Sequence, residues 1–174
     1  MRLVRTEPRG SGSAPLATAR LTSESTEETR AFAAWLANVA QPGDRLALVG
    51  PLGAGKTQFA KGFATGLGIE AVVNSPSFTL MAEYEGRLTL FHQDLYRLAD
   101  ASEVLAGGLL DERQDDGVTL SEWADRLDEG LDPGRVTVTI EPAGEARREL
   151  AITGRGPTAE RYLAAARAWT ERPA

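Results

Sequence analysis

Hydrophobic and polar positions divide the chain into segments with helical and strand periodicity. The first clear element is a helix that starts after Ser25, because Ser25 and Glu28 match the pattern of a helix N-terminal capping box. Its apolar positions repeat every three or four residues and consist of Phe32, Trp35, Leu36 and Val39. The polar, glycine-containing stretch 41–44 ends this predicted helix.

A strand, a glycine-rich loop and a second helix are predicted next. The short apolar run 46–49 favours a buried strand, and it leads directly into the sequence GPLGAGKT at 50–57. The second helix follows, because apolar residues recur at helical spacing at Phe59, Phe63 and Leu67.

Later segments alternate between apolar and polar residues, as strands do. Two of them flank Glu85-Gly86, which predicts a hairpin. Further strands are predicted at 118–123, 135–140 and 148–153, and the last two are expected to pair across the turn-like stretch 141–144. Helices are predicted at about 101–110 and 158–169. This mixture of crossovers and hairpins predicts a single-domain α/β fold with a mixed sheet. The strand, glycine-rich loop and helix at 46–67 further predict three α/β/α layers, as in P-loop NTPases. Residues 1–20 lack periodicity and are predicted to form a flexible tail before a domain at 21–174.

Composition narrows the possible functions. The 174 residues include no cysteine, which excludes disulfides, thiolate metal sites and a cysteine nucleophile. A net charge of -6 argues against unaided binding to nucleic acid, because such binding depends on many basic residues. The sequence has neither the apolar core of a signal peptide nor an apolar run of about 18 residues, so we expect a cytoplasmic protein without membrane contact.

The glycine-rich loop carries the strongest functional signal. Residues 50–57 match the phosphate-binding pattern G-x-x-x-x-G-K-[ST], in which backbone N–H groups surround a phosphate at the start of a helix. The predicted nucleotide-binding residues are Gly53, Ala54, Gly55, Lys56, Thr57 and Gln58. Lys56, one of only two lysines, is expected to neutralise the β- and γ-phosphates, and Thr57 to bind Mg²⁺ through its hydroxyl.

A nucleotide site of this kind also needs a carboxylate at a neighbouring strand end. Asp94 and Glu122 each lie at the end of a predicted strand, and their spacing does not indicate which of them is this carboxylate. His92 is the only histidine, so histidine-based metal clusters and triads are excluded, and a structural role is favoured for it. For Trp123, beside Glu122, two roles are open, packing in the core and shaping the site, and core packing is favoured.

Four segments together resemble the TsaE family, also called YjeE. They are GPLGAGKT (50–57), SPSFTLMAEY (75–84), HQDLYRL (92–98) and SEW (121–123), and the resemblance extends from about residue 25 to 153. It implies a small, weakly active ATPase that uses ATP and Mg²⁺ and docks on the TsaB–TsaD complex. That complex makes N6-threonylcarbamoyladenosine at tRNA position 37, so the contact with tRNA is indirect.

The resemblance also implies residue roles. Lys56 and Thr57 keep their phosphate and Mg²⁺ roles, Glu122 becomes the Mg²⁺ carboxylate, and Asp94 becomes the acid linked to hydrolysis. Tyr96 and Arg97 belong to the same functional segment as Asp94, and residues 75–78 form a switch-like segment with Ser77 in place of the usual Thr. Pro51 stands where an acidic residue is common in the family, and Thr26 is implied as a contact to the nucleotide base.

Two other functions are consistent with the same loop. A small-molecule kinase would add an arginine-bearing lid and an acceptor pocket, for which the available segments are short. A nucleotide-gated binding module would use ATP and ADP to set its affinity for a partner, without requiring hydrolysis.

Overall fold

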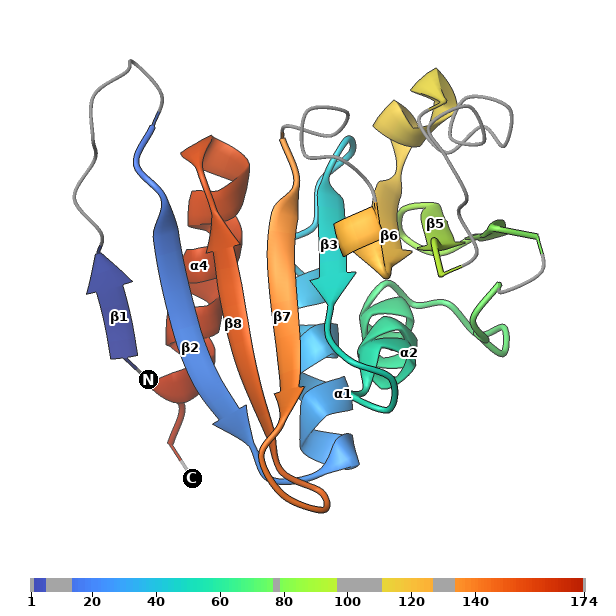
Figure 1. Ribbon diagram of the computed structural model, residues 1–174. Coiled ribbons are helices and arrows are strands. Elements are labelled where there is room, and N and C mark those ends of the chain that lie inside the picture. The colour runs from blue at the N-terminus through green and yellow to red at the C-terminus, as the bar shows by residue number, and fades with distance from the viewer. Residues whose placement is uncertain (1, 6–13, 77–78, 97–110, 127–133, 174) are drawn as a thin grey trace.

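The computed structural model describes residues 2–5, 14–76, 79–96, 111–126 and 134–173, which form a β-sheet covered by helices (Figure 1). The strands are β1 (Arg2–Arg5), β2 (Ala17–Ser23), β3 (Arg45–Val49), β4 (Met81–Tyr84), β5 (Leu90–Asp94), β6 (Val118–Glu122), β7 (Val136–Pro142) and β8 (Arg148–Gly154). The helices are α1 (Thr26–Ala37), α2 (Lys56–Gly66) and α4 (Gly156–Thr170), with short 3-10 helices η1 (Glu112–Asp116) and η2 (Ala124–Arg126).

The described strands form one mixed sheet in the order β1-β2-β8-β7-β3-β6-β5-β4. Its centre is parallel, because β3 pairs in parallel with both β6 and β7, and β5 pairs in parallel with β6. The flanking pairs are antiparallel, including the predicted hairpins β4–β5 and β7–β8. The predicted α/β fold with a mixed sheet is therefore confirmed.

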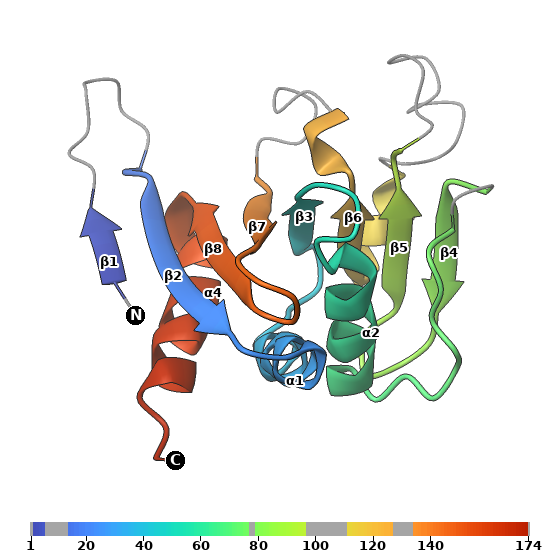
Figure 2. The same cartoon turned by 60° about the horizontal axis from the view of Figure 1, so that its bottom comes forward.

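The three α-helices of the described residues lie side by side on one face of the sheet, with α1 between α2 and α4 (Figure 2). The strands turn their apolar side chains toward these helices, and Phe32, Phe59 and Phe63 fill the space between them. The helix predicted at 101–110 falls outside the described residues. The described part of the chain therefore shows two of the three predicted layers.

Helix α1 begins as its sequence predicts. The Ser25 side chain accepts a hydrogen bond from the Glu28 N–H at 3.0 Å, and the Glu28 carboxylate accepts one from the Glu24 N–H at 2.6 Å. Helix α2 approaches α1 closely through its glycines: a Cβ on Gly62 would lie 2.2 Å from the Arg30 carbonyl oxygen. The middle and the end of α2 are thus packed directly against the backbone of α1.

The prediction for the N-terminal segment is partly wrong. Residues 17–20, assigned to a flexible tail, belong to β2, which pairs with β8 along its whole length. Residues 2–5 form β1 at the edge of the sheet, and residues 6–13 are outside the described part. No helix among the described residues has the length and apolar character needed to cross a membrane.

Candidate functional site

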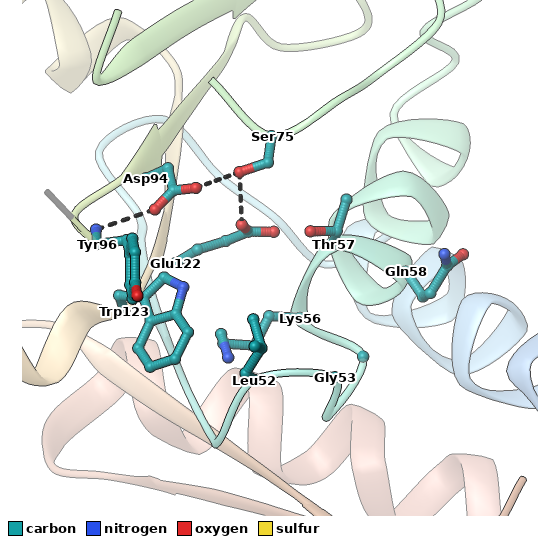
Figure 3. Close-up of a pocket in the computed structure, with 11 residues that line it drawn as sticks. Leu52, Gly53, Lys56, Thr57, Gln58, Ser75, Asp94, Tyr96, Glu122 and Trp123 are labelled. Atoms are coloured by element: carbon teal, nitrogen blue, oxygen red, sulfur yellow. Dashed lines mark hydrogen bonds between the residues drawn. The ribbon is translucent and has the colours of Figure 1, made fainter. Parts of the chain in front are cut away.

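A pocket of about 500 Å³ lies at the carboxyl ends of the parallel strands β3, β6 and β5 (Figure 3). Ligands of open parallel sheets bind at this edge, because loops there connect strand ends to helix starts. The pocket is lined by Leu52, Gly53, Gly55, Lys56, Thr57, Gln58, Ser75, Asp94, Tyr96, Glu122 and Trp123.

The glycine-rich loop forms one wall, between the end of β3 and the start of α2. Gly53 and Gly55 have φ angles of 77° and 111°, in the left-handed region that glycine adopts without steric cost. The first intrahelical bond of α2 runs from the Phe59 N–H to the Gly55 carbonyl, so the N–H groups of residues 56–58 precede any helical acceptor. Such a helix start favours anions through its N–H groups and its dipole.

The Lys56 side chain crosses the loop and ends in the pocket. Its ammonium donates to the carbonyls of Gly50 at 2.6 Å and Pro51 at 3.0 Å, and lies 3.8 Å from the centre of the Trp123 ring. Burial lowers the pKa of Lys56, while the carboxylates of the opposite wall act to raise it. The pocket thus contains a partly desolvated cation beside an anion-binding helix start.

Two acids form the opposite wall, at the ends of neighbouring strands. Asp94 and Glu122 are direct register partners of β5 and β6, and both are almost fully buried. The Ser75 hydroxyl contacts both of them, with an Asp94 Oδ2 hydrogen bond and a 3.0 Å contact to Glu122 Oε2. The Asp94 Oδ1 atom also accepts a hydrogen bond from the Tyr96 N–H at 3.0 Å.

The second oxygen of Glu122 has no such partner. Glu122 Oε1 is buried and accepts no hydrogen bond from any described residue, although Nε2 of the fully buried His92 lies 3.4 Å away. Figure 3 shows the Thr57 hydroxyl facing the Glu122 carboxylate across the pocket. A carboxylate oxygen and a hydroxyl facing each other are the hard oxygen donors that Mg²⁺ accepts.

The structure brings most of the predicted site residues around this one pocket. The exception within the loop is Ala54, whose side chain is buried and whose N–H donates to the Pro51 carbonyl at 3.1 Å. Thr26, the proposed base contact, is exposed at the start of α1 and does not line the pocket. Ser77, Phe78 and Arg97 lie outside the described residues.

The favoured role of Trp123, core packing, is wrong, because its ring lines the pocket beside the Lys56 ammonium, in agreement with the alternative that it shapes the site. Its φ of 55° turns the chain at the end of β6 and directs the side chain into the site. The position directly after Glu122 at a strand end was the available sequence signal. No local sequence pattern indicates that Ser75 connects the two acids.

Comparison with known proteins assigns this geometry to a family. The model of the family described as "Threonylcarbamoyl adenosine biosynthesis protein TsaE" matches residues 23–150. The chain belongs to the TsaE family. This membership confirms the family resemblance of the sequence and places the chain in threonylcarbamoyladenosine biosynthesis.

Individual TsaE relatives support the assignment. The chain is 50% identical over 131 residues to the protein TsaE of Bacillus subtilis, covering 75% of this chain and 82% of the relative. It is 37% identical to TsaE of Treponema pallidum, covering 76% of this chain and 98% of the relative. The crystal structure of Bacillus subtilis YdiB superposes with a TM-score of 0.73 at 38% identity, covering 91% of this chain and 100% of that one.

Proposed function

We propose that the protein binds ATP with Mg²⁺ in this pocket and hydrolyses it in support of the TsaB–TsaD complex, in the cytoplasm. The observation that carries the proposal is the arrangement of the pocket walls. Lys56 and Thr57 at the start of α2 face Asp94 and Glu122 at the ends of two parallel strands. This arrangement offers phosphate-binding and cation-binding groups within one cavity.

The loop and the start of α2 would hold the phosphates. The N–H groups of residues 56–58 supply donors at the positive end of the helix. The Lys56 ammonium would exchange its present carbonyl acceptors, Gly50 and Pro51, for phosphate oxygens. Because these acceptors belong to the same loop, the ammonium needs only a short movement.

Thr57 and Glu122 would hold Mg²⁺, which bridges phosphate oxygens and offsets their charge when bound. The described residues contain no cluster of three or more histidine, aspartate or glutamate side chains suited to a metal ion. Affinity for the ion would therefore depend on the phosphates of the nucleotide, as is usual where Mg²⁺ retains several waters.

Asp94 would orient the attacking water through its carboxylate. Ser75 holds one oxygen and the Tyr96 N–H holds the other, so the carboxylate is fixed in direction. Oriented carboxylates position a water for attack on a phosphoryl group without supplying much covalent chemistry themselves. Weak activity of the isolated protein is expected if docking on a partner completes the site.

Two exposed side chains at the pocket rim favour a partner at its mouth. Leu52 is 85% exposed and Tyr96 is 48% exposed, and both line the pocket. Exposed apolar and aromatic side chains beside a site provide contact area for a protein partner. We assign this surface to the TsaB–TsaD complex.

The proposal is tested by mass spectrometry of tRNA nucleosides from cells depleted of the protein. The wild-type gene should restore threonylcarbamoyladenosine and Lys56→Ala should not, with an ATP Kd at least about 30-fold higher in calorimetry. Lys61→Ala, on the outer part of α2, is the matched control. Normal ATP binding by the Lys56→Ala variant contradicts the proposal.

Asp94→Ala separates ATP hydrolysis from nucleotide-gated binding. We expect this variant to bind ATP within about threefold of wild type and to dock on the partner, but not to restore the modification. Full restoration by the Asp94→Ala variant would favour a binding module in which hydrolysis is incidental.

A further inference from the structure

An arginine outside the pocket holds the phosphate-binding loop from its outer side. Arg148 is the first residue of β8, directly after the turn that follows β7. Its Nε donates to the Ala54 carbonyl at 2.8 Å and its Nη2 to the Gly53 carbonyl at 3.3 Å. Arg148 is thus bonded to the loop although 93 or more residues separate them in sequence.

The rest of the guanidinium is fixed by the β7–β8 turn. Its Nη1 donates to the carbonyls of Gly144 at 3.3 Å, Glu145 at 3.2 Å and Arg147 at 2.8 Å. The planar guanidinium presents its donors in a rigid fork, so bonds on one side fix the direction of bonds on the other. The turn therefore sets where the loop carbonyls lie.

The direction of these carbonyls determines the direction of the neighbouring N–H groups. In a planar trans peptide, the C=O and the following N–H point in opposite directions. The Ala54 carbonyl and the Gly55 N–H belong to the same peptide group. When Arg148 binds the Ala54 carbonyl, the Gly55 N–H therefore points away from Arg148. Gly55 lines the pocket, and its φ of 111° leaves this peptide with little intrinsic preference for one orientation.

We propose that Arg148 is a positioning residue that fixes the phosphate-binding loop in its anion-binding conformation. Without it, glycines 53 and 55 would sample other orientations, and a nucleotide would have to order them on binding. A positive charge on the carbonyl side also polarises the Ala54–Gly55 peptide toward the phosphate side. This inference rests on the proposed nucleotide site and adds a residue that touches no nucleotide.

The nucleotide test compares two adjacent arginines. We expect Arg148→Gln to raise the Kd for ADP and for ATP about tenfold. Arg147→Gln is the matched control, since Arg147 is half exposed and its Nε lies 3.6 Å from a Glu24 oxygen, away from the loop. It should bind within about twofold of wild type, and equal weakening in both variants would overturn the proposal.

Arg148→Lys separates positioning from charge. It retains the positive charge but lacks the fork that connects loop and turn, so we expect a Kd about threefold above that of wild type. A lysine variant that binds as tightly as wild type would overturn the positioning role, because charge alone would then be sufficient.

Amide hydrogen exchange without nucleotide provides an independent readout. Arg148→Gln should speed exchange of the Ala54 N–H, which donates to the Pro51 carbonyl, at least about fivefold, with exchange in α1 and β3 unchanged. Unchanged exchange in the loop overturns the inference. If the wild-type protein bound no nucleotide, the proposed function would fail, while faster loop exchange in the variant would still support the role of Arg148 in ordering the loop.

Discussion

Ser75 is the residue that connects the two acids of the pocket. Its single hydroxyl contacts Asp94 Oδ2 and Glu122 Oε2, although it can donate only one proton at a time. Two carboxylates on neighbouring strands repel each other when both are ionised, and a shared hydroxyl keeps them oriented. Ser75 therefore sets the relative direction of the acids.

Ser75→Ala should lower the rate of ATP hydrolysis about tenfold and change the ATP Kd less than about threefold, because it disturbs the acids and leaves the loop intact. Phosphate release and calorimetry measure these two quantities. Thr79→Val serves as the control, since its exposed hydroxyl contacts only the Met81 carbonyl among the described residues. Normal turnover by Ser75→Ala would assign that hydroxyl a structural role only.

At the residue scale, the sequence predicted those side chains whose role is local. Lys56 and Thr57 follow from a contiguous motif, because the loop and the helix start are built from neighbouring residues. Asp94 and Glu122 were recognised as strand ends, but only sheet register makes them partners. Ser75 and Arg148 act through contacts that span many residues of sequence, and no local pattern encodes such contacts.

At the scale of elements, helices α1 and α2 pack with almost no space between their backbones. Gly62 faces the Arg30 carbonyl, and a Cβ on Gly66 would lie 2.4 Å from the Ala34 carbonyl oxygen. A side chain at either position forces the helices apart, which disturbs the aromatic core between them. The glycines therefore maintain the position of the helix that carries Lys56.

Gly62→Ala should destabilise the protein by about 2 kcal/mol, since overpacking against the α1 backbone exceeds the gain in helix propensity. The free energy of unfolding in urea measures the effect. Gly134→Ala provides the comparison, because an added Cβ there meets no atom of the described residues within 4 Å. Equal stability of the two variants would mean that the helices separate without cost.

Strand β2 shows why one element could not be predicted. Its residues 17–23 include Ala17, Thr18 and Ala19, which carry little apolar surface and give a weak alternating signal. Its strand conformation depends on pairing with β8, more than 120 residues later, and with β1. In contrast, β3 and the β4–β5 hairpin were predicted because their apolar runs and turn are local.

At the scale of the whole molecule, a buried polar cluster ties the C-terminal helix to the entry of the central strand. Asp44, just before β3, accepts hydrogen bonds from Arg161 Nη1 at 2.5 Å and from the Tyr162 hydroxyl at 2.7 Å. Arg161 also donates to the Val39 carbonyl at 3.0 Å. Helix α4 is thereby fixed to the turn that follows α1 and to the start of β3.

This cluster predicts alkaline sensitivity. Burial, reinforced by Asp44, raises the pKa of the Tyr162 hydroxyl, so the folded protein retains this proton more tightly than the unfolded chain. Its contribution to stability is complete below pH about 10 and declines above it by up to about 1.4 kcal/mol per pH unit. Urea unfolding at pH 8 to 11 should show a shallower decline for Tyr162→Phe than for wild type or for Tyr96→Phe. Identical slopes in all three would contradict the assignment.

The register between β5 and β6 fixes the distance between the backbones of the two acids. Because Asp94 and Glu122 stand opposite each other in a hydrogen-bonded ladder, strand spacing of about 4.8 Å sets their backbone separation. Insertion of one residue into β5 would turn Asp94 to the opposite face of the sheet, so this strand tolerates substitution far better than a change in length.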